Sequence, residues 1–319
     1  AYVCPHAVIR PFAMTDDELK SAPEATKSKA MTGVPGMNFT LAVSMLDCTG
    51  CSSCSQVCPA KQKALVMKPI DSQREQQKVF NYVFDLPAKE EVAAKFKETT
   101  VKGSQFKQPL LEFSGACGGC GETPYAKLAT QLFGDKMFIA NATGCSSIWG
   151  GSAPATPYTV NKNGHGPAWE NSLFEDNAEF GLGMQLAQNA VRGRLAEYIE
   201  KIAEGAKEAG DNEMVTACTE YIETMGSTRA NDEKTKTLVA KLEELAKGDC
   251  AGAELAKKTL ADKDFLAKKS VWILGGDGWA YDIGFGGVDH AIASGENINI
   301  LVFDTEVYSN TGGQASKAT

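Results

Sequence analysis

Two short apolar runs near the carboxyl end of the chain have the pattern of buried strands. Residues 270–274 run straight into a pair of glycines, and residues 297–304 form a second run that ends in the polar turn 305–310. Apolar runs of this length bounded by turn residues predict strands buried on both faces. We expect a strand, a crossover helix and a second, parallel strand. Ligands of such units lie beyond the carboxyl ends of the strands, where Asp277 falls.

The turns after these two strands carry residue types suited to a metal-bound diphosphate. Gly276 and Gly278 allow a diphosphate to approach the backbone closely, and Asp277 between them offers a carboxylate oxygen of the kind that Mg²⁺ prefers. Thr305 adds a hydroxyl and Val307 a carbonyl oxygen from the second turn. Taken alone, the glycine motif has a plain alternative interpretation as a strand-to-helix turn without a ligand.

The remaining pattern extends this α/β unit in both directions. Residues 110–113 predict a strand, a helix begins at Thr123-Pro124 with proline at its first position, and residues 136–142 predict a further strand. A long helix with a regular apolar face follows, and residues 204–269 predict a helical hairpin with a thin apolar stripe, inserted into the α/β domain. Residues 10–44 show little periodicity, and residues 71–109 predict a linker with a short charged helix near 89–97.

Composition narrows the class of protein. The chain has 319 residues, 43% hydrophobic content and a net charge of -8. An acidic chain without clustered basic residues argues against a nucleic-acid surface. Because the sequence has neither an apolar run of 18 residues nor a secretory signal, we expect a soluble, cytoplasmic protein and no membrane contact.

Cysteine spacing supplies the strongest chemical signal before residue 70. The run from Cys48 through Cys51 and Cys54 to Cys58-Pro59 has the bacterial ferredoxin spacing. In two-cluster ferredoxins the fourth cysteine of such a run binds the other cluster, so Cys4-Pro5 is interpreted as the end of an earlier run. Cys4 then joins Cys48, Cys51 and Cys54 on one [4Fe–4S] cluster, and Cys58 serves a different one. A structural zinc site is the weaker alternative, since zinc favours paired knuckles.

Three more cysteines follow strands that we expect at one sheet edge. Cys117, Cys120 and Cys145 could hold a third [4Fe–4S] cluster near the diphosphate site. A fourth thiolate is needed, and Cys218 and Cys250 are poor candidates, because they lie in charged helical sequence where a free thiol is the better interpretation.

The glycine-flanked Asp277 followed by Asn310 resembles the thiamine-diphosphate motif. With Thr305 in place of the usual first Asn, and with the runs 149–158 and 166–177, the sequence resembles the pyruvate:ferredoxin (flavodoxin) oxidoreductase family. The resemblance implies a partial two-cluster ferredoxin-like α+β domain at 1–70, a linker at 71–109 and a thiamine-diphosphate domain at 110–319 with the helical insertion at about 204–269. It adds Trp279 to the cofactor contacts, makes Cys145 one of them, and places the catalytic Asn310 beside the reacting carbon. It also implies that the fourth ligand of the third cluster follows Asn310, so we expect the chain to be cut at both ends.

The same resemblance implies an enzyme that oxidatively decarboxylates pyruvate to acetyl-CoA and CO₂. Its cofactors are thiamine diphosphate, Mg²⁺ and three [4Fe–4S] clusters, and its partners are coenzyme A, ferredoxin or flavodoxin, the remaining domains of the polypeptide and a second copy in a homodimer. Two alternatives stay open: an oxidoreductase for another 2-oxo acid, such as 2-oxoglutarate or indolepyruvate, and a non-catalytic iron–sulfur electron-transfer subunit.

Overall fold

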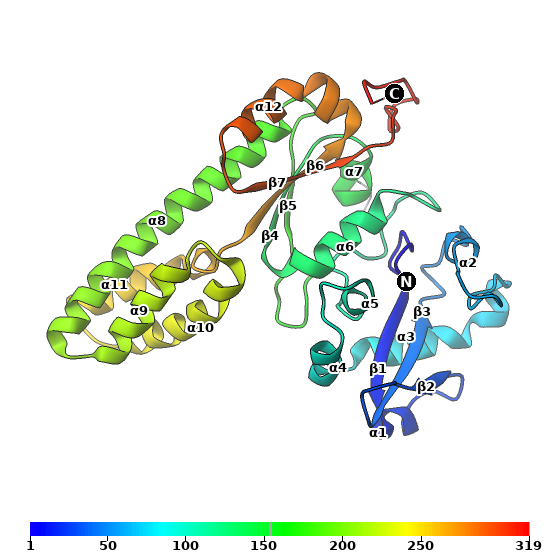
Figure 1. The fold of residues 1–319 in the computed structure, drawn as a ribbon, viewed down its shortest axis with the longest axis horizontal. Coiled ribbons are helices and arrows are strands. Elements are labelled where there is room, and N and C mark those ends of the chain that lie inside the picture. Colours follow the sequence, from blue (N-terminus) through cyan, green and yellow to red (C-terminus); the bar gives the residue numbers. More distant parts are fainter. Residues whose placement is uncertain (153–154, 319) are drawn as a thin grey trace. The chain divides into compact units, whose positions relative to one another are not determined.

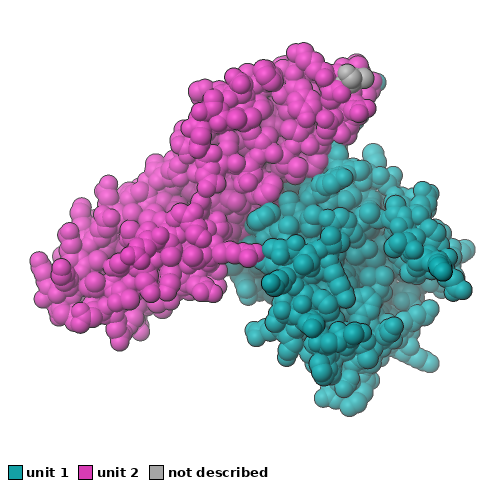
Figure 2. Space-filling view, viewed as in Figure 1, with its two compact units in different colours: residues 1–135, 143–168, 309–312 teal, residues 136–142, 169–308, 313–319 magenta. Residues whose placement is uncertain are grey.

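The computed structural model describes residues 1–152 and 155–318, and the chain divides into two compact units. Unit 1 comprises residues 1–135, 143–168 and 309–312, and unit 2 comprises residues 136–142, 169–308 and 313–319 (Figure 2). The domain limits expected near residues 70 and 110 stay predictions. No helix in the described ranges combines the length and the apolar character needed to cross a membrane.

Unit 1 contains a three-stranded antiparallel sheet. Its order is β1-β3-β2, with β1 at Ile9–Thr15, β3 at Met37–Val43 and β2 at Ser28–Ala30 (Figure 1). Residues 10–44, which show little periodicity in the sequence, therefore contain most of this sheet. Inward-facing residues such as Met14 and Ala42 do not alternate strictly with polar ones, so the period of two was weak in the sequence.

Short helices complete unit 1. Helix α3 (Glu75–Asp85) packs Val79, Phe80 and Val83 against the sheet, although a linker was expected there. The charged helix expected near 89–97 is α4 (Glu90–Lys95), and the helix expected at Thr123-Pro124 is α6 (Thr123–Phe133) with proline in its first turn. The other helical segments of this unit are α1 (Asp16–Lys20), α2 (Ser53–Gln56), η1 (Ile70–Gln73), α5 (Val101–Ser104), α7 (Cys145–Ser147) and η3 (Ile148–Ser152).

The strand expected at residues 110–113 does not form. Leu111 makes only an isolated antiparallel bridge with Tyr158. The two neighbouring residues form hydrogen bonds outside any strand pair. The Leu110 N–H donates to the Thr130 hydroxyl of α6, at 3.1 Å, and the Glu112 N–H donates to the Pro157 carbonyl, at 2.9 Å. Leu110 and Leu111 are buried, but the backbone hydrogen bonds of this run go to a helix side chain and a loop rather than to a strand ladder.

Unit 2 is built on a mainly parallel sheet of order β5-β4-β6-β7. Strand β4 (Met137–Asn141) pairs in parallel with β6 (Ser270–Gly276), which pairs in parallel with β7 (Ile298–Phe303), while β5 (Ala168–Asn171) is an edge strand. The connection from β6 to β7 contains the π-helical turn η5 (Gly278–Ile283) and helix α12 (Phe285–Ala293). The predicted strand, crossover helix and parallel strand are thus confirmed.

Helix α8 (Asn177–Ala209) joins this sheet to a group of helices. At its start the Asn177 amide donates to the carbonyls of Leu274 and Ala140, at 2.9 and 3.3 Å, which ties the helix to β6 and β4. Gly181 allows the close approach, because a Cβ there would lie 2.4 Å from Ile273. The sheet end of α8 is therefore fixed by both hydrogen bonding and packing.

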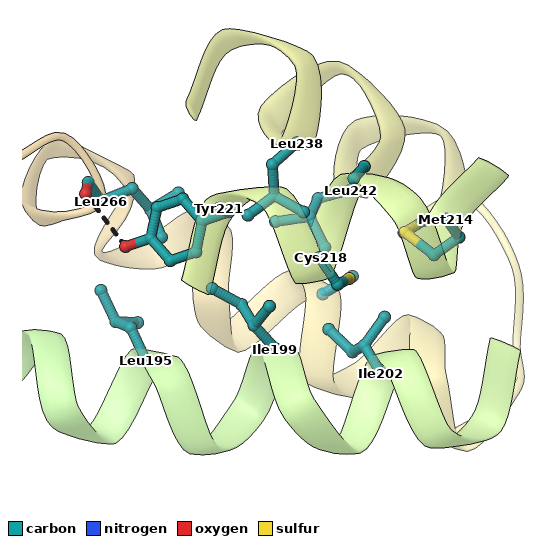
Figure 3. Packing of buried hydrophobic residues seen from close by; sticks show 11 residues of the cluster. Leu195, Ile199, Ile202, Met214, Cys218, Tyr221, Leu238, Leu242 and Leu266 are labelled. Atoms are coloured by element: carbon teal, nitrogen blue, oxygen red, sulfur yellow. Dashed lines mark hydrogen bonds between the residues drawn. The ribbon is translucent and has the colours of Figure 1, made fainter. Parts of the chain in front are cut away.

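The helical insertion has a core of its own. Helices α9 (Asn212–Thr224), α10 (Thr228–Leu245) and α11 (Ala251–Ala261), with η4 (Lys263–Phe265), pack along the second half of α8 (Figure 1). Figure 3 shows Leu195, Ile199 and Ile202 of α8 facing side chains of the other helices, and the Tyr221 hydroxyl donates to the Leu266 carbonyl at 3.0 Å. The expected hairpin with a thin stripe is thus too simple, because three further helices bury a continuous apolar cluster.

Candidate functional site

Four cysteines that are distant in the sequence line one pocket, called here the four-thiol pocket. Cys4 precedes β1, Cys48 and Cys51 follow β3, and Cys54 lies in α2. Its other lining residues are Pro5, His6, Val8, Ile9, Thr49, Ser52 and Met67. The structure therefore brings together the four cysteines that the two-cluster ferredoxin pattern assigns to one cluster.

The thiols of this pocket act on one another electrostatically. Burial raises the pKa of Cys54, and the neighbouring Cys4, Cys48 and Cys51 thiolates raise it further. Burial also opposes ionisation of Cys51, yet its pKa is lowered by hydrogen bonds to the sulfur, among them those from the Ser53 and Gly119 N–H groups. N–H groups aimed at a sulfur are the kind of contact that stabilises a thiolate.

Cys58 does not line the four-thiol pocket. Hydrogen bonds from backbone N–H groups, foremost that of Ala64, lower its pKa, and the Ala64 nitrogen lies 3.3 Å from its sulfur. This placement agrees with a separate role for Cys58, which stays a prediction.

Cys117, Cys120 and Cys145 form a second cysteine group in unit 1. Burial raises the pKa of Cys145, and the Glu122 carboxylate and the Cys120 and Cys117 thiolates raise it further, whereas a hydrogen bond with Ser309 lowers it. The Cys145 sulfur and the Ser309 hydroxyl oxygen are 3.4 Å apart. The three thiols predicted to share a cluster are therefore neighbours.

The two cysteine groups of unit 1 adjoin each other. A Cβ added at Gly118 would lie 3.7 Å from the Cys51 Cβ, and one at Gly119 would lie 3.8 Å from it. Gly119, with φ of +83°, adopts the left-handed conformation that favours glycine, and its N–H reaches the Cys51 sulfur. One peptide between Cys117 and Cys120 thus contacts the four-thiol pocket.

Asp277 lies at the carboxyl end of β6 and is 1% exposed. Its Oδ1 accepts hydrogen bonds from the Thr305 N–H and hydroxyl, both at 3.2 Å, and its Oδ2 accepts one from the Ser316 hydroxyl. The Thr305 hydroxyl also lies 3.0 Å from the Val307 carbonyl oxygen. The structure therefore brings together the three oxygens predicted to bind Mg²⁺.

The glycines beside Asp277 differ in their surroundings. A Cβ on Gly276 would meet only the Phe303 carbonyl oxygen, at 3.9 Å, whereas one on Gly278 would lie 2.8 Å from the Tyr308 ring. Trp279 is fully buried in the core under this turn. Any contact between Trp279 and a bound cofactor would therefore involve the backbone atoms of Trp279.

Asn310 lies in an exposed turn after Tyr308. The Tyr308 N–H donates to the Gln314 carbonyl at 2.8 Å, and the Gly313 N–H donates to the Tyr308 carbonyl at 3.0 Å. These bonds close the loop that carries Asn310.

The three histidines and the two cysteines of the helical insertion have varied surroundings. The His6 Nδ1 lies 3.0 Å from the Ser114 carbonyl oxygen in the interior, whereas His165 and His290 are exposed. Cys218 is buried in the helical core, and Cys250 is exposed at the start of α11. In the run 149–158, Ala153 and Pro154 lie outside the described residues.

Sequence reasoning missed three buried polar residues at these sites. Ser316 donates to Asp277, Glu122 accepts a hydrogen bond from the Trp149 indole at 2.9 Å, and Lys127 of α6 is 2% exposed. Glu122 could have been suspected from the sequence, because it lies two positions after Cys120. The residues around Ser316 and Lys127 give no such indication.

The oxygen and sulfur atoms of these sites differ in the metal chemistry they offer. Carboxylate, hydroxyl and carbonyl oxygens suit Mg²⁺, and thiolates suit iron–sulfur clusters. Across residues 1–152 and 155–318, no three His, Cys, Asp or Glu side chains form a group that could hold a metal ion. Thiolates of a cubane bind different irons and so stand further apart than the ligands of one ion.

A cysteine-rich unit and a mainly parallel α/β sheet with a buried Asp at a strand end define this chain as a thiol-bearing α/β protein. No family model matches it. It is 53% identical over 319 residues to pyruvate-flavodoxin oxidoreductase of Klebsiella pneumoniae, covering 100% of this chain and 26% of that protein. It is 53% identical over 325 residues to pyruvate:ferredoxin oxidoreductase of Moorella thermoacetica, covering 99% and 27%. With pyruvate dehydrogenase [NADP(+)] of Euglena gracilis the identity is 48%, covering 100% and 17%.

Over its whole length the chain is homologous to part of the pyruvate:ferredoxin and pyruvate-flavodoxin oxidoreductases, and the resemblance found in the sequence is confirmed. It spans about a quarter of the length of these curated relatives.

Proposed function

We propose that this chain supplies the thiamine-diphosphate and iron–sulfur part of an enzyme that oxidises pyruvate and coenzyme A to acetyl-CoA and CO₂. Ferredoxin or flavodoxin accepts the electrons, as the names of the relatives suggest. The observation that carries the proposal is the convergence of the Asp277, Thr305 and Val307 oxygens at the end of β6. Homology along the whole chain supports it.

The Asp277 site fits a magnesium diphosphate chemically. Asp277, Thr305 and Val307 would hold the ion with three hard oxygens, and Gly276 leaves open space where a phosphate can approach the backbone. Thiamine diphosphate stabilises the carbanion that remains when a 2-oxo acid loses CO₂. The buried position of Asp277 keeps water from competing for its carboxylate, and Asn310 would lie beside the reacting carbon.

The two cysteine groups fit electron transfer out of this site. Iron–sulfur clusters take up one electron at a time, which suits a two-electron oxidation carried out in two steps. Cys117, Cys120 and Cys145 would hold the cluster that takes electrons from the cofactor, the four-thiol pocket would hold another, and Cys58 would bind the remaining one. The contact between Gly119 and Cys51 supports transfer between the first two groups.

The finer assignments follow from the same proposal. Residues 1–70 would form part of a two-cluster ferredoxin-like domain, and residues 110–319 the thiamine domain with its helical insertion. The other domains of the relatives would supply the remaining ligands and the group that activates thiamine, and two copies would form a homodimer in the cytoplasm.

The test is an anaerobic assay of viologen reduction by the full-length polypeptide that carries this sequence, with pyruvate and coenzyme A. Asp277→Asn keeps the shape of the side chain but removes the negative charge. Loss of an outer-shell partner of a metal ligand costs about 10–100-fold in activity, so for a ligand itself we expect pyruvate-dependent reduction to fall at least about 100-fold. Asp289→Asn is the matched control, because Asp289 is exposed on α12.

Each result has a definite meaning. Equal rates for both variants would contradict the thiamine assignment. Reduction with 2-oxoglutarate or indolepyruvate in place of pyruvate would move the substrate to another 2-oxo acid. Clusters that accept electrons from dithionite but from none of these acids would make the chain an electron carrier.

A further inference from the structure

Lys127 is a buried lysine that the proposed chemistry does not use. It lies in α6, and only 2% of its surface is exposed. Its ammonium donates hydrogen bonds to the carbonyl oxygens of Ala1 and Tyr2, at 2.7 and 3.0 Å. A lysine this buried is uncommon without a partner, so its surroundings need an explanation.

The two carbonyls belong to the turn that presents Cys4. The Cys4 N–H also donates to the Ala1 carbonyl, at 3.1 Å, so one oxygen accepts from both Cys4 and Lys127. Cys4 itself is 5% exposed and faces the four-thiol pocket. The ammonium therefore fixes the backbone immediately before one of the four sulfurs.

The charge of Lys127 has no carboxylate partner among the residues that the structure describes. Burial lowers the pKa of Lys127 to about 8, and the Cys4 thiolate is the group that acts in the opposite direction. At neutral pH the side chain remains mostly protonated. Arg10, the other buried cation near Cys4, differs, because it forms an ion pair with Glu112.

A buried cation beside a thiolate pocket has a predictable effect on a bound cluster. A [4Fe–4S] cluster with four thiolates becomes more negative by one charge when it is reduced. A fixed positive charge in a low-dielectric interior stabilises that reduced state. The effect persists because the ammonium is held by two carbonyls rather than by a neutralising acid.

We propose that Lys127 is a positioning residue for the four-thiol pocket, where it fixes the Cys4 turn and raises the midpoint potential of the cluster bound there. This inference rests on the proposed function, since it requires a cluster on these four cysteines. It links α6, which begins three residues after Cys120, to the turn that presents Cys4.

The experiment is an anaerobic redox titration of the cluster-loaded full-length protein, followed by electron paramagnetic resonance and by iron analysis. Cys54→Ala, which leaves no donor atom at this position, first identifies the signal of the four-thiol pocket, because that signal and its iron should be lost. Lys127→Met removes charge and hydrogen bonds, and Lys127→Gln keeps a donor without the charge. Lys257→Met is the control, because Lys257 is an exposed lysine of α11.

We expect Lys127→Met and Lys127→Gln to keep the iron and to shift the midpoint potential of this signal downward, with no shift in Lys257→Met. Gln should give the sharper signal of the two, since it still anchors the turn. Unchanged potentials, or a potential restored by Gln, would overturn the role of the charge. Loss of the cluster from both variants in a folded chain would also overturn it and leave Lys127 a structural support.

One result would contradict the proposed function rather than the role of Lys127. If Cys54→Ala removes neither a signal nor iron, the four-thiol pocket binds no cluster. Lys127 would then have no cluster to act on, and the assignment of the pocket itself would be the one that fails.

Discussion

Single residues at the Asp277 turn are constrained by packing as well as by ligand chemistry. The Tyr308 ring, which lies over Gly278, is held by its hydroxyl, which donates to Asp282 at 2.7 Å, and by an edge-to-face contact with Phe174. A ring fixed on two sides cannot move aside cheaply. The turn therefore depends on the absence of a side chain at position 278.

This constraint gives a stability prediction. Gly278→Ala should lower the free energy of unfolding by about 1–3 kcal/mol, because the new methyl group would lie 2.8 Å from the Tyr308 ring. Gly286→Ala on α12 is the control, since a Cβ there meets nothing within 4 Å, and it should be neutral or gain up to about 1 kcal/mol. Urea denaturation measures both, and equal effects would contradict the packing argument.

Cys218 and Cys250, the two cysteines of the helical insertion, should differ in reactivity. Burial raises the pKa of Cys218 to about 11, so at pH 8 only roughly 0.1% of it would be thiolate even if a reagent could enter. Cys250 is exposed. Brief maleimide labelling at pH 8 followed by peptide mass spectrometry should find Cys250 modified and Cys218 intact until the chain is unfolded. Early labelling of Cys218 would mean that the helical core opens readily.

Local spacing explains which site residues could be predicted. The interval between Cys48, Cys51 and Cys54 is a property of adjacent residues, and so is the glycine-flanked Asp277. Ser316 and Lys127 are different, because their roles depend on which distant backbone or carboxylate folds against them. Nothing in the residues around Lys127 indicates that the Ala1 and Tyr2 carbonyls lie beside it.

At the scale of elements, strands of the parallel sheet were the most predictable. Runs such as residues 270–274 are apolar because both faces are covered, and this signal needs no knowledge of the partner strand. The antiparallel strands β1 and β3 were missed because their burial alternates irregularly. The strand expected at 110–113 was apolar for a different reason, since it packs in unit 1 without pairing as a strand.

The helical group supplies a prediction of its own. Leu242 is fully buried in the cluster of Figure 3, so Leu242→Ala should lower the stability of unit 2 by about 2–5 kcal/mol. Leu186→Ala is the control, because Leu186 of α8 is 49% exposed and its loss should cost little. Circular dichroism during denaturation reports the difference, and a minor effect at Leu242 would show that the cluster contributes little to stability.

At the scale of the molecule, sequence segments and compact units do not coincide. Residues 136–142 belong to unit 2, whereas residues 1–135 and 143–168 belong to unit 1, so the chain crosses between units several times. Domain boundaries predicted from the sequence assume that each domain is one continuous segment of the chain. Contacts between distant segments, which decide the units, carry no local signal.

Helix α8 has a consequence for the dynamics of unit 2. Its 33 residues span about 50 Å. Its first turns are pinned to β4 and β6, and its later turns form one wall of the helical cluster. Because one unbroken helix belongs to both cores, neither core can open widely without releasing amides of the other. The slowest-exchanging backbone amides of the sheet and of the helical group should therefore exchange together, as one cooperative unit.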